Sequence, residues 1–216
     1  KMYWTDQRLA GIHRANLDGS EVETSTIFSV QNPHKLALDA QNNMLYWTDW
    51  SGSKIQRVNL DGPHADVVLG TALRATWGLE LALYCGKMYW TDYGYEKIQR
   101  ANLDGSEIED LVVSRLDDPR DIALDGPSGK IYWANYKGGY TMIQRSNLDG
   151  SEIEDLVRSG LDGLSSMALD LRYGKIYWTD SRVGWIRRSN LDGTRAEFVF
   201  TTELESPRGI ALDLVE

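Results

Sequence analysis

The chain is a succession of short apolar segments in which apolar and polar residues alternate. One copy of the pattern holds an apolar stretch such as Gly209–Asp213, then Tyr-Trp-Thr-Asp, Ile-x-Arg-x-Asn and a final Leu-Val stretch. Alternation over such short lengths predicts β-strands, and no segment has the periodicity of a long amphipathic helix. Leu-Asp-Gly between the third and fourth stretches supplies turn residues. We therefore expect an all-β protein of four-stranded units.

The pattern repeats about every 43 residues, as three independent markers show. Tyr-Trp-Thr-Asp begins at Tyr3, Tyr46, Tyr89 and Tyr177, and the variant Tyr-Trp-Ala-Asn begins at Tyr132. Asn-Leu-Asp-Gly begins at Asn16, Asn59, Asn102, Asn147 and Asn190. Segments of the Ile-Ala-Leu-Asp type end at Asp39, Asp125, Asp170 and Asp213, with Leu79–Ala82 at the corresponding place in the remaining copy. Four short strands at this period predict the blades of a β-propeller.

Five copies of the motif predict five four-stranded blades in a single domain, residues 1–216. The chain begins on the second strand of one blade and ends on the first strand of another. Pro207–Asp213 would then supply the innermost strand of the blade that starts at Tyr3. Such pairing of the N- and C-terminal strands closes the propeller and leaves no open sheet edges.

The motifs, recurring together and in order, resemble the YWTD repeats of the low-density lipoprotein receptor family, nidogen and the Wnt co-receptors. The resemblance covers essentially the whole chain. It implies a propeller that is usually six-bladed, so the alternative to five blades is part of a six-bladed propeller. It also implies an extracellular or secreted binding module, although the disulfide-rich modules that flank the family's propellers are absent.

Composition narrows the classes of partner. The formal charge of -9 disfavours a polyanionic backbone, so we expect no nucleic acid partner. No apolar stretch is long enough to span a membrane. The single cysteine, Cys85, excludes an internal disulfide framework. We expect no cofactor and no metal, since the fourth motif has Asn135 in place of the acid and five equivalent sites are excluded.

The motif itself is predicted to be structural. Side chains alternate along a strand, so Tyr and Thr should face one side of a blade while Trp and Asp face the other, and both sides should be buried. Counting across the hairpin predicts that an arginine stacks on each motif tryptophan. The predicted pairs are Trp4 with Arg14, Trp47 with Arg57, Trp90 with Arg100 and Trp178 with Arg188.

Function is expected where the copies differ, at one end of the propeller. The loops before the innermost strands carry residues that should surround the channel mouth: His34, Trp77, Arg120, Ser165 and Arg208. The loops after the motif strands carry aromatic residues: Trp50, Tyr93, Tyr95, Tyr136, Tyr140 and Trp185. Tyrosine, tryptophan and arginine are enriched at binding hot spots, so we predict that a protein ligand binds this end. Glu80, beside Trp77, could anchor a basic side chain of that ligand.

Two other classes of function compete with a protein-binding module. A carbohydrate-binding propeller would use a pocket repeated once per blade, but the loop aromatics do not occupy one equivalent position in every copy. A hydrolase with its site in the channel needs converging acids or histidines, for which only Glu80 and the nearby His34 are candidates. No Gly-x-Ser-x-Gly, His-Glu-x-x-His or phosphate-loop motif is present. We therefore predict a non-catalytic protein.

Overall fold

The structure, a computed structural model, describes residues 1–6, 8–23, 30–62, 64–71, 73–159, 161–200 and 204–213. The chain divides into two compact units, Lys1–Asp110 and Leu111–Glu216, whose boundary falls inside strand β10. In the described residues, the regular structure consists of strands and one 3-10 turn, η1 (Leu83–Cys85). None of the helical structure described there is long and apolar enough to cross a membrane.

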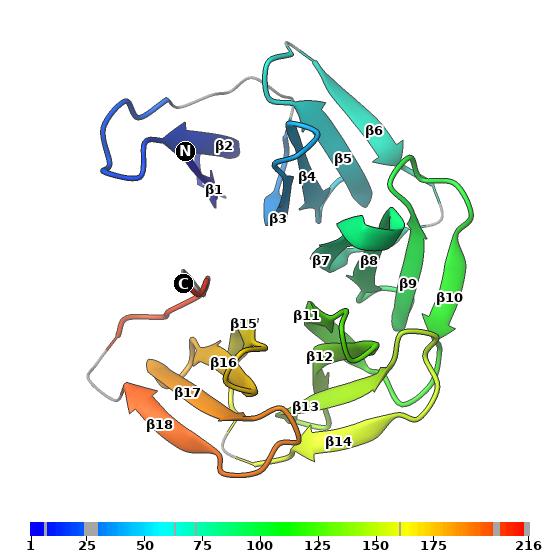
Figure 1. The fold of residues 1–216 in the computed structure, drawn as a ribbon, viewed down its shortest axis with the longest axis vertical. Coiled ribbons are helices and arrows are strands. Elements are labelled where there is room, and N and C mark those ends of the chain that lie inside the picture. Colours follow the sequence, from blue (N-terminus) through cyan, green and yellow to red (C-terminus); the bar gives the residue numbers. More distant parts are fainter. Residues whose placement is uncertain are drawn as a thin grey trace. The chain divides into compact units, whose positions relative to one another are not determined.

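The first unit contains one two-stranded and two four-stranded antiparallel sheets (Figure 1). The two-stranded sheet pairs β1 (Met2–Asp6) with β2 (Gly11–Ala15). The next sheet follows the chain through β3 (Pro33–Asp39), β4 (Met44–Asp49), β5 (Lys54–Asn59) and β6 (Ala65–Leu69). The third consists of β7 (Thr76–Ala82), β8 (Lys87–Asp92), β9 (Lys97–Asn102) and β10 (Glu109–Val112). Each strand pairs with the next one along the chain, as in a propeller blade.

The second unit repeats this arrangement in two more four-stranded sheets. The fourth copy of the motif forms β11 (Asp118–Asp125), β12 (Lys130–Lys137), β13 (Tyr140–Asn147) and β14 (Glu154–Val157). The fifth forms β15 (Leu164–Asp170), β16 (Lys175–Asp180), β17 (Trp185–Asn190) and β18 (Glu197–Phe200). The predicted four-strand unit is therefore confirmed in four of the five copies.

The motif aromatics build the cores between sheets, as the alternation predicts. Trp47, Trp90, Trp133 and Trp178 are completely buried. Trp47 packs in a cluster with Ile12 of the first copy, whereas the neighbouring Tyr46 packs in another cluster with Trp90 of the third copy. Adjacent motif residues thus face opposite sides of one sheet. Burying side chains of this size supplies much of the hydrophobic stabilisation of each sheet.

The predicted stacking of each motif tryptophan on an arginine is wrong by one residue. Asp49 pairs with Lys54 across the hairpin, which places Tyr46, and not Trp47, opposite Arg57. Tyr3, Tyr89 and Tyr177 likewise lie opposite Arg14, Arg100 and Arg188. A one-residue shift of register moves every side chain to the other face of a strand. The residue opposite the tryptophan is a glutamine in three copies, His13 in the first and Arg187 in the fifth.

The prediction of five four-stranded blades closed by the chain termini is also wrong. The described residues form four four-stranded sheets and the two-stranded sheet β1–β2, and residues 207–213 form no strand. In the other copies a tight turn such as Asp39–Met44 joins the innermost strand to the motif strand, so little loop entropy is lost on pairing. The first copy has no such local partner. Its outer strand is represented by a bridge between Arg14 and Glu23, and residues 24–29 lie outside the described part.

The motif threonines link each copy to the next within a unit. The hydroxyl of Thr5 donates to the carbonyl oxygen of His34 at 3.2 Å, and that of Thr48 donates to Trp77 at 3.0 Å. Thr179 donates in the same way to Arg208 at 2.8 Å. The segment after Pro207 therefore lies against the fifth sheet where the innermost strand of a following blade would start, although it does not form that strand.

Candidate functional site

The motif acids organise one end of every sheet. Pro33 at the start of β3 pairs with Asp49 at the end of β4, which pairs with Lys54 at the start of β5. We call this end of each sheet the motif-acid end; it lies at Asp6, Asp49, Asp92, Asn135 and Asp180. The loops before the innermost strands and the hairpins after the motif strands both belong to it. The turns between the first two strands form the opposite end.

The motif acids hold loops by accepting backbone hydrogen bonds, and Asp49, Asp92 and Asp180 each hold two loops. Asp49 accepts N–H groups of Gln31 and Asn32 from one loop and of Gly52 from the hairpin. Asp92 accepts those of Arg74 and Tyr95, while burial raises the pKa of its carboxyl against the lowering effect of these bonds. The motif carboxylates are thus committed to holding backbone, and among the described residues no group of three potential metal ligands exists.

The fourth copy differs because its hairpin is longer. Beyond Asn135 two further pairs form, Tyr136 with Thr141 and Lys137 with Tyr140. Gly138 and Gly139, at φ of 60° and 96°, make the two-residue turn. Asn135 therefore uses its amide differently. Its Nδ2 donates to the carbonyl oxygen of Arg115 and to Oε1 of Gln144. Its Oδ1 accepts from the N–H groups of Asp117 and Asp118.

Four of the predicted loop aromatics are exposed at motif-acid ends. The exposed fractions are 39% for Trp50, 42% for Tyr93, 49% for Tyr95 and 48% for Tyr140. Tyr136 is only half-buried, with the guanidinium of Arg120 at 5.3 Å from its ring centre. Trp185 instead packs edge-on against Phe198 of its own sheet, with ring centres 5.0 Å apart.

The residues predicted to surround a channel mouth are spread over both units. In the first unit, the rings of His34 and Trp77 contact each other at 4.1 Å between centres. In the second, Arg120 pairs with Asp118 at 2.9 Å, and the Ser165 hydroxyl bonds that of Ser181 at 2.7 Å.

Arg208 and Glu80 complete the predicted set. Arg208 is exposed and is fixed through its backbone by Thr179. Glu80, half-buried on β7, lies opposite Tyr89 in the sheet register.

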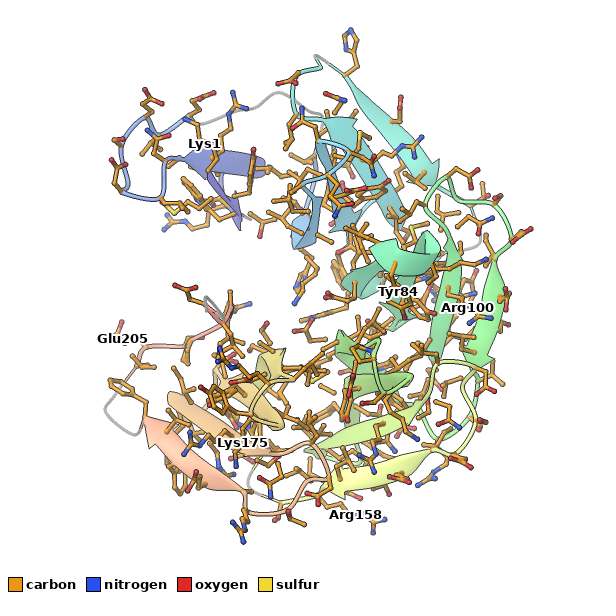
Figure 2. All side chains as sticks on the ribbon, in the orientation of Figure 1. Lys1, Tyr84, Arg100, Arg158, Lys175 and Glu205 are labelled. Carbon is orange, nitrogen blue, oxygen red and sulfur yellow. The ribbon has the colours of Figure 1, made fainter. Side chains whose placement is uncertain are left out.

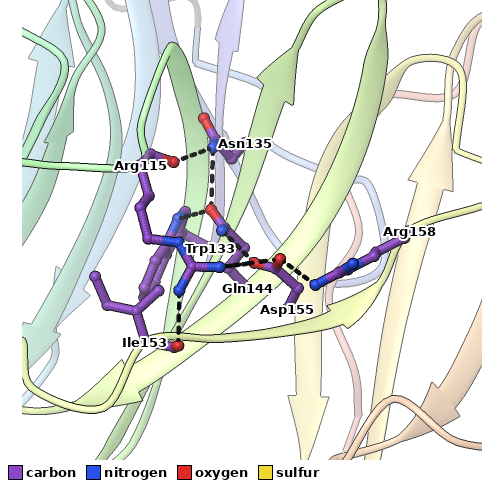
Figure 3. Close-up of polar contacts among 7 residues, drawn as sticks. All are labelled: Arg115, Trp133, Asn135, Gln144, Ile153, Asp155 and Arg158. Carbon is purple, nitrogen blue, oxygen red and sulfur yellow. Dashed lines mark hydrogen bonds and ion pairs between the residues drawn. The ribbon is translucent and has the colours of Figure 1, made fainter.

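Sequence reasoning missed a pocket in the fourth copy. It has a volume of about 220 Å³ and is lined by Arg115, Lys137, Tyr140, Met142, Gln144, Asp155 and Arg158. Figure 3 shows its polar wall, in which Asp155 lies between Arg115 and Arg158. Only Tyr140 of this group had been singled out. The signal in the sequence was Met142, which stands where the second and third copies have Lys54 and Lys97.

Two segments of the chain match a known family of repeats. Residues 86–125 and 174–214 match the family model described as low-density lipoprotein receptor repeat class B. These two segments are therefore similar to the class B repeats of the low-density lipoprotein receptor. No curated protein matches the chain in sequence.

Solved structures agree with this assignment at the level of fold. A chain of the nidogen/laminin complex matches with a TM-score of 0.82 and 23% identity, over 92% of this chain and 77% of that one. A putative TolB from Agrobacterium tumefaciens matches with a TM-score of 0.73 and 16% identity, over 92% and 76% of the two chains. A gluconolactonase from Xanthomonas campestris matches with a TM-score of 0.62 and 19% identity, over 73% and 58%. The chain thus has an all-β propeller fold.

Proposed function

We propose that this chain is a non-catalytic, extracellular module that binds a protein through the motif-acid ends of its sheets. The observation that carries the proposal is the exposure of Trp50, Tyr93, Tyr95 and Tyr140 at these ends. The motif residues around them are committed to packing and to holding loops. Exposed aromatic side chains on a rigid framework supply contact area at a low cost in conformational entropy.

The relatives support the same class of function. Class B repeats are generally found in protein-binding domains, and one structural neighbour belongs to a complex of nidogen with laminin. The gluconolactonase is similar in fold at low identity, and a shared fold does not imply a shared activity. In the part that the structure describes, the candidates for catalysis, Glu80 and His34, belong to no cluster of three potential metal ligands.

The test compares two sets of exposed aromatics at opposite ends of the sheets. The variant Trp50→Ala/Tyr93→Ala/Tyr95→Ala removes side chains at motif-acid ends. The matched control, Tyr84→Ala/Tyr173→Ala, removes tyrosines that are 65% and 69% exposed at the opposite ends. Figure 2 shows Tyr84 on η1.

Each protein is immobilised, checked for native circular dichroism, and used to capture proteins from an extracellular matrix extract. We expect the affinity of the triple variant for its partner to fall about thirtyfold or more, since hot-spot aromatics contribute about 2 kcal/mol or more each. The control should keep it. Equal recovery of every captured protein by all three chains would contradict the proposal, and capture that a glycosidase removes would favour a carbohydrate ligand instead.

A further inference from the structure

The pocket of the fourth copy is built on the hairpin of two long strands. The eight-residue strands β12 and β13 extend the hairpin by two residue pairs and carry Lys137 and Tyr140 at its tip. Met142, which is buried, and Gln144 follow Tyr140 at every second position along β13. Tyr140, Met142 and Gln144 therefore line one face of the strand and form one wall of the pocket.

Asp155 holds the cationic side of this pocket in place. Its side chain is only 9% exposed and accepts hydrogen bonds from Gln144 Nε2 at 2.5 Å, Arg115 Nη2 at 3.0 Å and Arg158 Nη2 at 2.6 Å. Arg115 is fixed a second time through Nη1 on the carbonyl oxygen of Ile153. Arg158, by contrast, has 69% of its side chain exposed, at the outer edge of the sheet (Figure 2).

The pocket carries an excess of positive charge in a chain that is strongly negative overall. Its three cations, Arg115, Lys137 and Arg158, pair with two carboxylates, Asp155 and Asp117. One positive charge is left over, in a chain with a net charge of -9. Lys137 lies 3.4 Å from Asp117 and is 44% exposed, so both Lys137 and Arg158 can turn donors toward a ligand at little desolvation cost.

The third copy shows why the cavity exists. There Lys97 occupies the position of Met142, and its Nζ pairs with Asp110 at 2.6 Å, while Gln99 donates to the same acid. In the fourth copy the equivalent acid, Asp155, takes its cations from two loops. Met142 is shorter than a lysine and uncharged, so the space that a lysine's ammonium group would fill stays open. The side chain of Met142 lines that space with an apolar surface between the cations.

We propose that this pocket binds an acidic side chain of a polypeptide partner, with an adjacent apolar residue of that partner against Tyr140 and Met142. Arg158 and Lys137 donate to the carboxylate, and Arg115 stabilises it from behind through its charge. The proposal rests on the proposed protein-binding function and names the chemistry of one contact at a motif-acid end.

Size and charge favour this ligand over two others. Sites for whole small molecules measure about 300–1,000 Å³, so a pocket of about 220 Å³ suits one or two side chains. A sulfated polysaccharide needs a stripe of basic residues, and the surrounding chain of charge -9 would repel a polyanion.

The test follows the methyl signal of Met142 in protein labelled with ¹³C at the methionine methyl groups. The probes are N-acetyl-leucyl-aspartate amide, the same compound with asparagine, and a sulfated heparin disaccharide, each up to about 20 mM. We expect the aspartyl compound to shift Met142 saturably, the asparaginyl compound to do so at least fivefold more weakly, and the disaccharide not to compete.

Variants locate the effect. Arg158→Gln and Lys137→Gln should each weaken binding of the aspartyl probe about fivefold. Met142→Lys, which lacks the methyl reporter and is therefore followed by isothermal titration with the aspartyl probe, should rebuild the ion pair of the third copy and abolish binding, with the Trp133 environment unchanged in circular dichroism. The matched control is Arg182→Gln, an exposed arginine on the equivalent hairpin of the fifth copy, which should bind like the wild type.

The outcomes separate this proposal from the proposed function. Absence of a Met142 shift, equal shifts with aspartyl and asparaginyl probes, or displacement by the disaccharide would overturn the pocket proposal. The protein partner captured through Trp50 and Tyr93 could still be lost in the aromatic variant, and that result would leave the proposed function standing.

Discussion

The third and fourth sheets share a framework and differ in the length of one hairpin and at a few side chains. In both, the buried tryptophan donates through Nε1 to the glutamine opposite it, Trp90 to Gln99 at 3.2 Å and Trp133 to Gln144 at 3.0 Å. In the third sheet a lysine on the strand neutralises the acid beside that glutamine. In the fourth sheet the lysine is replaced by Met142, and loop arginines take its role.

This difference teaches that the repeat keeps its core constant and changes what lies next to it. Where Met142 stands in place of Lys97, the cations that pair with the equivalent acid come from loops and not from the strand. A pocket results, without any change in the number of strands or the direction of the chain. The charged side chains at a motif-acid end can thus differ between two sheets whose buried tryptophans pack in the same way.

The strongest test of the shared framework is removal of the tryptophan from either sheet. Trp90→Ala and Trp133→Ala should each lower the free energy of unfolding by about 3–5 kcal/mol, because each leaves a large cavity and a glutamine without its donor. Urea denaturation followed by circular dichroism measures both. Trp50→Ala, at an exposed position, should cost less than about 1 kcal/mol. If the two buried variants differed by several kcal/mol, the frameworks would not be equivalent.

Asn135→Asp asks whether the fourth sheet could return to the usual motif. A carboxylate would face the carbonyl oxygen of Arg115 and Oε1 of Gln144, which now accept from Nδ2 at 2.9 and 3.0 Å. We expect a loss of about 2–4 kcal/mol in thermal or urea unfolding, since the new charge is buried among acceptors.

Asn147→Asp in the same sheet is the control, because Lys130 Nζ donates to its side-chain oxygen at 2.6 Å. It should change stability by less than about 1 kcal/mol. An Asn135→Asp protein as stable as this control would show that the longer hairpin does not require the amide.

Gly139→Ala tests the two-residue turn that lengthens the fourth hairpin. The glycine has a φ of 96°, and a Cβ placed there would meet nothing within 4 Å, so the expected cost of about 1 kcal/mol is backbone strain alone. Gly209→Ala, where neither positive φ nor a close contact exists, should be neutral. Equal melting temperatures for the two variants would show that an alanine at position 139 causes no destabilising backbone strain.

Lys97→Met gives the third sheet the residue of the fourth, and we expect the smallest effect. The ion pair to Asp110 is part-exposed, so its loss should cost no more than about 1 kcal/mol. The hydrogen bond from Lys97 lowers the pKa of Asp110, so the variant should raise that pKa, measured from the carboxyl ¹³C shift.

The sign of the pH dependence follows from that lowered pKa. The folded-state pKa of Asp110 lies below the ordinary aspartate value of 3.8, so the pair stabilises the protein above that pH. This contribution is lost as pH falls through the folded pKa. Wild type and Lys97→Met should therefore converge in stability in acid, and a constant difference down to that range would exclude the pair as the cause.

The sequence predicted the repeating features of the fold because they depend on local pattern. The four-strand unit, the burial of the motif tryptophans and the structural role of the motif acids all follow from alternation and turn chemistry. The predicted arginine partners are wrong because Asp49 pairs with Lys54 and not with Ile55, which shifts the register by one residue. Blade closure was wrong because it depends on the meeting of distant ends of the chain, about which local pattern says nothing.

The candidate site could be predicted in part. The exposed aromatics Trp50, Tyr93, Tyr95 and Tyr140 lie at the expected ends, but Trp185 packs against Phe198, a contact that depends on tertiary packing. The pocket could not be foreseen, because Arg115 and Arg158 come from loops of irregular conformation that converge on Asp155 only in three dimensions.

The hydroxyl links between successive copies have a consequence for local opening. Thr5, Thr48 and Thr179 each bond a carbonyl of the following copy, but the fourth motif has Ala134, which has no hydroxyl. There a buried carboxylate of the inner strand, Asp121, accepts from Ser166 Oγ and the Met167 N–H instead. Within each unit these bonds couple neighbouring copies, so amide exchange should spread inward from the least-supported copies. A charged acceptor holds the junction of the fourth and fifth copies.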